Sequence, residues 1–183
     1  MTPSERKILH DDSGVGAALE RMSREIVQFA GGTDRLVLVG IQRRGSDLAE
    51  RLCRMIAEAE GATVPLGVMD ITLYRDDLQT IGPRPVVGET RLPVDLDDRW
   101  VMIVDDVLFT GRTIRAALDQ LADFGRPARI GLSVLVDRGG RELPIQADIV
   151  GLKVDAQSSD RVDVLVAELD GRDAVELVHG GNT

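Results

Sequence analysis

The fold is decided by the stretch Val101-Met-Ile-Val-Asp-Asp-Val-Leu-Phe-Thr-Gly-Arg-Thr113, in which an apolar run is followed by two acids and a short polar loop. A continuous apolar run, here beginning at Trp100, is typical of a strand buried on both faces of a parallel sheet. The loop leads into apolar residues at helical spacing, Ile114, Leu118 and Leu121, and Gly125 and Pro127 are expected to end this helix. The stretch therefore predicts a strand, a polar turn and a helix, with two carboxylates just past the strand.

The chain before this stretch repeats the alternation of helix and strand. An amphipathic helix is predicted from residue 13 to Phe29, with Ser13 as its cap and Gly31-Gly32 as its end. A buried strand follows over 35–40. A second helix is expected to begin at a Ser46 cap. Two strand and helix pairs in succession favour a parallel sheet.

The chain after it continues the pattern and then changes. A further buried strand is predicted over 129–136. The segments 161–168 and 174–178 flank Asp170-Gly171, which is typical of a hairpin. We therefore expect an α/β fold, with a central, mostly parallel sheet flanked by helices and a C-terminal β-hairpin. The prediction is one domain over residues 1–183, with a flexible loop at about 75–91.

Composition and charge exclude several classes of protein. The chain has 183 residues, of which 43% are hydrophobic and 29% charged, as in ordinary globular proteins. Its single cysteine, Cys53, excludes a disulfide scaffold. The net charge of −9 argues against a protein that coats nucleic acid non-specifically, although a local basic face remains compatible with it. No stretch approaches the ~18 apolar residues of a membrane span, so we expect no membrane partner and a cytoplasmic location.

The chemistry of the deciding stretch points to a sugar phosphate. Thr110 to Thr113 offer backbone N–H groups, hydroxyls and a guanidinium at a helix N-terminus, which favours an anion. Asp105 and Asp106 would repel a phosphate that faced them, but they suit sugar hydroxyls or a divalent metal. A sugar phosphate that bridges the two parts reconciles them. The plainer alternative is that both acids only cap a helix.

Four segments resemble the PyrR family of type I phosphoribosyltransferases, whose members combine pyrimidine operon regulation with uracil phosphoribosyltransferase activity. The deciding stretch resembles that class's binding motif for 5-phosphoribosyl 1-pyrophosphate (PRPP). The closer resemblance to the PyrR family is carried by Asp70–Leu78, Val104–Thr113, Gly125–Pro127 and Leu135–Gly139 followed by Arg141–Ile145. It covers roughly residues 10 to 178. The resemblance implies a type I phosphoribosyltransferase fold.

The resemblance implies Mg²⁺-dependent transfer of ribose 5-phosphate from PRPP to uracil. Asp105 and Asp106 would hold the ribose hydroxyls and stabilise the positive charge that develops on the sugar, with Mg²⁺ carried by PRPP near them. The 5′-phosphate would bind along the loop formed by Val107, Leu108, Phe109, Thr110, Gly111, Arg112 and Thr113.

Three further segments acquire roles through the resemblance. It assigns pyrophosphate to Gln42, Arg43 and Arg44, a closing loop to the segment with Arg75 and Arg84, and uracil to Val136, Asp137 and Arg138. From the residues alone, arginines in loops are usually solvated, and the last three residues fit an ordinary turn after a strand.

The resemblance also implies binding to pyrimidine operon leader RNA, with UMP or UTP as effector. Arg21, Arg24 and Arg141 match the family's RNA-binding face, whereas Glu20, Gly140, Gln146 and Leu152 depart from it. A salvage enzyme without RNA binding and a regulator with weak catalysis are the alternatives. A purine-specific enzyme is disfavoured because the Asp70–Leu78 and Val136–Ile145 segments look pyrimidine-type. We expect a homodimer or a higher oligomer.

Overall fold

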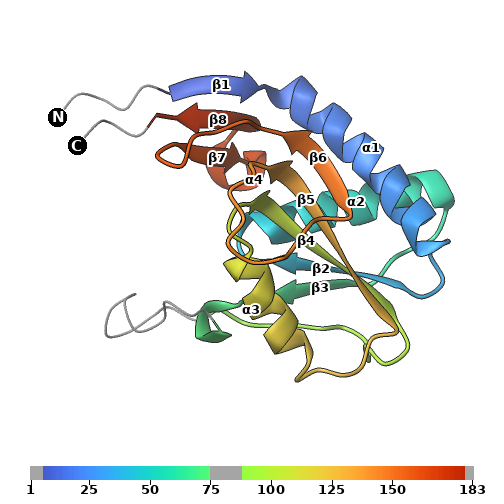
Figure 1. The fold of residues 1–183 in the computed structure, drawn as a ribbon. Helices are drawn as coiled ribbons and strands as arrows, with labels where there is room; N and C mark the ends of the chain where they lie inside the picture. Colours follow the sequence, from blue (N-terminus) through green and yellow to red (C-terminus); the bar gives the residue numbers. More distant parts are fainter. Residues whose placement is uncertain (1–5, 75–87, 180–183) are drawn as a thin grey trace.

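The computed structural model describes residues 6–74 and 88–179. The predicted α/β architecture is confirmed (Figure 1). In chain order its elements are β1 (Arg6–His10), α1 (Asp12–Ala30), β2 (Leu36–Ile41), α2 (Arg44–Glu60), β3 (Leu66–Met69), the 3₁₀ turn η1 (Thr72–Tyr74), β4 (Trp100–Leu108), α3 (Arg112–Leu121), β5 (Arg129–Asp137), β6 (Ile149–Lys153), β7 (Arg161–Leu165), α4 (Ala167–Asp170) and β8 (Ala174–Val178).

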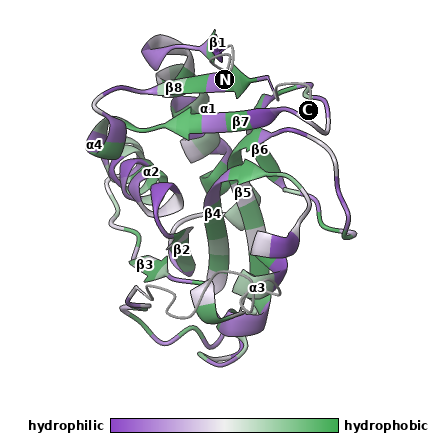
Figure 2. Cartoon of the chain, turned by 90° about the vertical axis from the view of Figure 1, so that its left-hand side faces the viewer, coloured by the Kyte–Doolittle hydropathy of each residue, from purple (hydrophilic) through white to green (hydrophobic). Residues whose placement is uncertain are grey.

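The central sheet has five parallel strands in the order β3-β2-β4-β5-β6. Helices α1 and α2 pack on one face, and α3 packs on the other. In β4, Trp100 and Met102 face α1 and α2, whereas Val101 and Ile103 face α3. Figure 2 shows the resulting hydrophobic colour along β4 and β5. Burial on both faces explains why these strands are continuous apolar runs.

A second, antiparallel sheet has the order β1-β8-β7. The predicted hairpin is its β7–β8 pair, joined through the single turn α4 and Gly171 at φ 75°. Strand β1 was not predicted, because Arg6-Lys-Ile-Leu-His10 is short and mostly exposed. Strand β4 contacts β7, and Asp106, near the carboxyl end of β4, lines a cavity together with residues of β7, so this sheet faces the loops that follow the central strands.

Three predicted boundaries are wrong, each for a local reason. The cap of α1 is Asp11, whose carboxylate accepts from the Gly14 amide at 3.0 Å, while the Ser13 hydroxyl donates to the same carboxylate. Helix α2 begins at Arg44, so Ser46 lies in its first turn rather than at its cap. Helix α3 ends at Leu121, before Gly125.

The carboxylates also lie differently from the prediction. Strand β4 continues to Leu108, so Asp105 and Asp106 belong to the strand rather than to the loop after it. Strand β5 pairs with β4 as far as Leu108 and Asp137, and this ladder overrides the low strand propensity of aspartate. The turn between β4 and α3 is therefore shorter than predicted and consists of 109–111.

Candidate active site

The acid pair lies at the carboxyl end of β4. Asp105 is 5% exposed and accepts from the Asp106 amide at 3.0 Å, while Asp106 accepts from the Val107 amide at 2.8 Å. Burial, and then the charge of Asp106, raises the pKa of Asp105 well above its usual range. Burial also raises the pKa of Asp106. Two carboxylates in such a site favour hydroxyl donors or a cation as ligand.

Two glycines bring the start of α2 onto the sheet beside these acids. A Cβ at Gly40 would lie 2.5 Å from Ser46 Cα, and one at Gly45 would lie 2.7 Å from the Val104 carbonyl. Only glycine permits so close an approach of helix and strand backbones. The segment Gln42–Arg44 is thereby held next to the acid pair.

A cavity of about 270 Å³ opens between these segments. It is lined by Ile41, Gln42, Arg43, Arg44, Asp70, Ile71, Thr72, Asp105, Asp106, Val107 and Thr113. The structure thus brings the predicted pyrophosphate residues, the acid pair and both ends of the phosphate loop, Val107 and Thr113, to one place. The peptide bond between Gln42 and Arg43 in this cavity is cis. We call this space the inner cavity.

Sequence reasoning missed Asp70 and Thr72 as residues of the inner cavity. The Asp70 carboxylate accepts from the Thr72 amide at 2.8 Å, from the Thr72 hydroxyl and from the Gly88 amide. Partial burial alone would raise the pKa of Asp70, but these hydrogen bonds lower it below its usual value. Asp70 therefore ties together the chain on both sides of 75–87. Arg75 and Arg84 lie outside the described residues.

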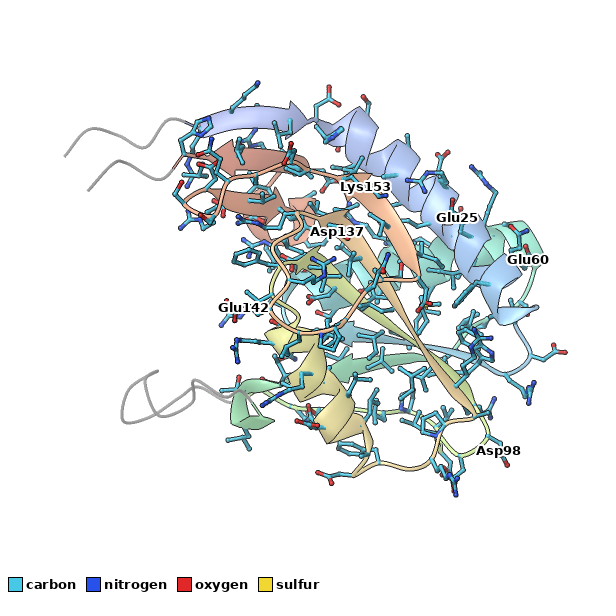
Figure 3. All side chains as sticks on the ribbon, in the orientation of Figure 1. Glu25, Glu60, Asp98, Asp137, Glu142 and Lys153 are labelled. Carbon is cyan, nitrogen blue, oxygen red and sulfur yellow. The ribbon has the colours of Figure 1, made fainter. Side chains whose placement is uncertain are left out.

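The phosphate loop is built on Gly111, which has φ 93° and precedes α3. Thr110 Oγ1 accepts from the Arg112 amide at 3.3 Å, and the Thr110 carbonyl accepts from Glu142 and Leu143 amides. Arg112 Nε donates to the carboxylate of Glu142 at 2.8 Å. Glu142, labelled in Figure 3, lies on the loop after β5. Leu108 is buried in the core, so its backbone alone is available to a ligand.

The residues predicted to bind uracil end strand β5. Val136 is fully buried, so only its backbone can meet a ligand. Arg138 donates to the carbonyls of Asp160 at 2.8 Å and Gln157 at 2.9 Å, and its guanidinium lies 4.0 Å from the centre of the Phe109 ring. Asp137 accepts from Arg141 at 2.6 Å. The two charged side chains are thus engaged within the protein.

A second cavity of about 410 Å³, here called the outer cavity, lies on the other side of Arg44 and Asp106. Both residues line both cavities. The rest of its lining comes from the second sheet and the turn α4: Arg6, Arg161, Val162, Asp163, Val164, Leu165 and Asp170. The sequence indicated only a hairpin here. No local pattern marks these residues as part of a site, because the tertiary packing of β7 puts them there.

The three arginines matched to an RNA-binding face differ in their surroundings. Arg21 pairs with Glu25 at 3.0 Å and donates to the carbonyls of Val150 and Gly151. Arg141 donates to the carbonyls of Phe109 and Ile145 as well as to Asp137. Arg24 is exposed, and no described residue pairs with it. Arg24 is therefore the freest of the three cations.

The donor set fits magnesium that arrives with a substrate. Among the described residues no group of three or more acidic, His or Cys side chains could hold a metal ion. Asp105 and Asp106 supply two carboxylates, and Mg²⁺ in proteins commonly takes one or two carboxylates plus substrate phosphates. The residues present therefore suit a shared rather than a resident cation. Within residues 6–74 and 88–179, no helix is long and apolar enough to cross a membrane.

The acid pair and the anion-binding turn lie at the carboxyl edge of a parallel sheet, where open α/β sheets bind their ligands, and a family profile shows that the class of protein is the phosphoribosyltransferases. The family profile described as "Phosphoribosyl transferase domain" matches residues 5–167. The chain is 61% identical over 160 residues to "Bifunctional protein PyrR" of Thermus thermophilus, covering 87% of this chain and 88% of that protein. It is 54% identical to the protein of that name from Chloroflexus aurantiacus, with 97% of each covered. The chain belongs to the PyrR family of phosphoribosyltransferases.

Solved structures with the same fold include two hypoxanthine phosphoribosyltransferases. The enzyme of Trypanosoma cruzi has a TM-score of 0.70 and 18% identity, and 97% of this chain and 98% of that chain are covered. The enzyme of Staphylococcus aureus has a TM-score of 0.69 and 19% identity, with 96% and 93% covered. At these identities the likeness establishes the type I phosphoribosyltransferase fold, as predicted.

Proposed function

We propose that the protein transfers ribose 5-phosphate from PRPP to uracil. The bond between ribose C1 and the pyrophosphate oxygen breaks, a bond from C1 to uracil N1 forms, and N1 loses its proton, which yields UMP and pyrophosphate. The observation that carries the proposal is the position of Asp106, which lines both the inner and the outer cavity. A sugar held beside Asp106 reaches a leaving group in the inner cavity, next to Gln42, Arg43 and Arg44.

Each part of the proposed site has a physical task. Asp105 and Asp106 accept hydrogen bonds from the ribose hydroxyls and stabilise positive charge on the sugar in the transition state. The turn from Val107 to Thr113 binds the 5′-phosphate at the start of α3. Gln42, Arg43 and Arg44 bind the pyrophosphate, and Arg75 and Arg84 contribute to phosphate binding. When Mg²⁺ is bound with PRPP, it neutralises diphosphate charge near the acid pair.

Uracil is proposed to lie beside Val136, Asp137 and Arg138. Support comes from the register of the sheet, in which Asp137 pairs with Leu108 next to the phosphate loop. Since the Asp137 and Arg138 side chains are engaged by Arg141 and by backbone carbonyls, backbone groups are expected to carry much of the base recognition. Recognition by fixed backbone groups discriminates well, because a wrong base leaves them unpaired.

The test is a comparison of bases with the purified wild-type protein. Turnover with uracil, PRPP and Mg²⁺ is expected, with hypoxanthine at least about 100-fold slower in kcat/KM. Preference for hypoxanthine would overturn the assignment of the base. Failure to consume PRPP with any base would overturn the proposed reaction as a whole.

We propose as a second function that the protein binds pyrimidine operon leader RNA in a uridine-nucleotide-dependent way. Support comes from relatives named "Bifunctional protein PyrR" and from the exposed Arg24. A titration with a cognate stem-loop, with and without UMP or UTP at two salt concentrations, tests it. Tight nucleotide-enhanced binding supports the regulator. No binding with normal uracil turnover identifies a salvage enzyme, and binding without turnover identifies a regulator with weak catalysis.

A further inference from the structure

We infer that Asp170 is a positioning residue for PRPP, because its carboxylate orients the guanidinium of Arg44 at the junction of the two cavities. The inference rests on the proposed function, since it takes Arg44 as a ligand of the diphosphate. It adds a residue to the site from a part of the chain that the acid pair and the phosphate loop do not reach.

The contact between the two side chains is a two-point ion pair. Arg44 Nη2 lies 3.0 Å from Asp170 Oδ1, and Arg44 Nε lies 3.2 Å from Asp170 Oδ2. The carboxylate is itself held, because Oδ2 also accepts from the Val166 amide at 2.9 Å. A planar fork on a fixed carboxylate has a defined orientation, unlike a single hydrogen bond. Asp170 therefore determines where the remaining donors of Arg44 lie.

The position of Arg44 makes that orientation relevant to the ligand. Arg44 lies in the first turn of α2 and lines both cavities beside Asp106. Asp170 lines only the outer cavity, whereas Gln42 and Arg43 line only the inner one, so Arg44 is bound by Asp170 on the side of the outer cavity. No described residue other than Asp170 pairs with Arg44. The Nη1 group is thus left for an anion.

A second ion pair, Arg51–Asp173, also joins α2 to the connection between β7 and β8, and it serves as a structural comparison. Arg51, two turns further along α2, binds Asp173 through Nη1 at 2.6 Å and Nη2 at 2.8 Å. Asp173 also accepts from a backbone amide, that of Ala167, at 2.7 Å. Both pairs join an arginine of α2 to an aspartate by two hydrogen bonds, although Arg51 also donates through Nε to Glu168 at 2.8 Å. The described linings of both cavities exclude Arg51 and Asp173.

The two pairs also differ in exposure. The side chains of Arg51 and Asp173 are 13% and 9% exposed, whereas those of Arg44 and Asp170 are 36% and 20% exposed. The more buried pair is the stronger tie between α2 and the connection from β7 to β8, because water screens it less. The Arg44–Asp170 pair is the one placed to act on a ligand.

The experiment compares Asp170→Asn with Asp173→Asn as its matched control. Asp170→Asn is expected to raise the KM for PRPP by about tenfold while kcat changes by less than about threefold, because Arg44 contacts the diphosphate before and during the reaction. Asp173→Asn is expected to lower the melting temperature more than Asp170→Asn does, with the KM for PRPP within about twofold of wild type. Asp170→Glu is expected to restore part of the affinity.

Two further measurements keep the inference testable. Asp170→Asn combined with Arg44→Ala is expected to weaken PRPP binding no more than Arg44→Ala alone, since Asp170 acts through Arg44. Calorimetric binding of PRPP with Mg²⁺ needs no base, so it tests the inference even if wild type does not turn over uracil. If Asp170→Asn does not fold, Arg44→Lys, which keeps the charge but loses the fork, is expected to show the same rise in KM. An unchanged PRPP affinity in Asp170→Asn, or an equal loss in Asp173→Asn, would overturn the role of Asp170.

Discussion

Two neighbouring segments follow the central strands β4 and β5, and they use their charges in opposite ways. In 105–113, no described cation forms an ion pair with Asp105 or Asp106, and Asp106 lines both cavities. In 137–141, Asp137 pairs with Arg141, and Arg138 donates to two backbone carbonyls. The same edge of a parallel sheet therefore carries an acid pair without an ion-pair partner among the described residues and, beside it, a segment whose charged side chains are bound within the protein.

The two segments also interlock through Phe109. Its ring lies under the Arg138 guanidinium and against Gly140, where a Cβ would lie 2.4 Å from Phe109 Cε2. Gly140 has φ 73°, a conformation that favours glycine. The glycine at this position thus has a packing reason, because a side chain here would collide with the Phe109 ring. The segment 137–141 therefore supports the phosphate loop through its contacts with Phe109.

Substitutions in the acid pair are expected to have the largest effect on activity. Asp106→Asn is expected to lower uracil phosphoribosyltransfer by about 100-fold, because the amide cannot stabilise positive charge on the sugar. Asp105→Asn is expected to cost at least about tenfold for the same reason. Steady-state kinetics measures both, and circular dichroism checks that the fold is kept. Unchanged activity in both variants would remove the acid pair from the mechanism.

In the segment 137–141, removal of a charge is expected to affect stability rather than activity. Arg138→Ala is expected to lower the free energy of unfolding by about 2 kcal/mol, because it leaves the carbonyls of Gln157 and Asp160 without their donor and uncovers Phe109. Denaturant titration measures the change. A variant as stable as wild type would contradict the structural role of Arg138 and make a ligand its main partner.

Asp105 and Asp137 are expected to change the stability of the fold with pH in opposite directions. Burial raises the pKa of Asp105, so the ionised carboxyl destabilises the fold as pH rises through that pKa. Partial burial alone would raise the pKa of Asp137, but Arg141 and the Gly139 amide lower it, so its stabilisation is lost as pH falls through that lowered pKa.

Melting temperatures of two variants follow from these signs. At neutral pH, Asp105→Asn is expected to be more stable than wild type and Asp137→Asn less stable. The deficit of Asp137→Asn is expected to shrink in acid as the wild-type carboxyl becomes protonated. Thermal unfolding from about pH 3 to about pH 8, a range that includes the ordinary pKa of aspartate and neutral pH, measures the melting temperatures of both variants. Equal pH profiles for the two variants would contradict the contrast.

The smallest expected effect concerns RNA. Arg24→Gln is expected to lower the slope of log affinity against log salt by about one, because Arg24 is exposed and free to meet a phosphate. Arg141→Gln is expected to change stability rather than this slope, since its donors are used by the protein. A filter-binding titration at several salt concentrations separates the two. The opposite ranking would place Arg141 in the RNA contact.

Much of the fold could be predicted because its signals are local. The apolar runs at 35–40, 100–104 and 129–136 are strands, and the helical spacing before Gly31 is a helix. The sites near those strands follow from the rule that ligands bind at the carboxyl edge of a parallel sheet. Strand β1 escaped prediction because it is mostly exposed, and β6 escaped because Gly151 interrupts its short apolar run.

By itself the sequence determined the α/β class, the C-terminal hairpin and the acid pair beside an anion-binding turn, since hydrophobic periodicity and turn chemistry act over a few residues. Only the tertiary structure decided that Asp105 and Asp106 lie inside β4, that Arg141 is engaged by backbone carbonyls, and that Arg44 meets Asp170 between two cavities. Those outcomes depend on contacts between residues as far apart in sequence as β4 and β5 or α2 and α4. Distant residues decide how a charged side chain is used, because an ion pair or a charge-assisted hydrogen bond forms only where the fold brings donor and acceptor together.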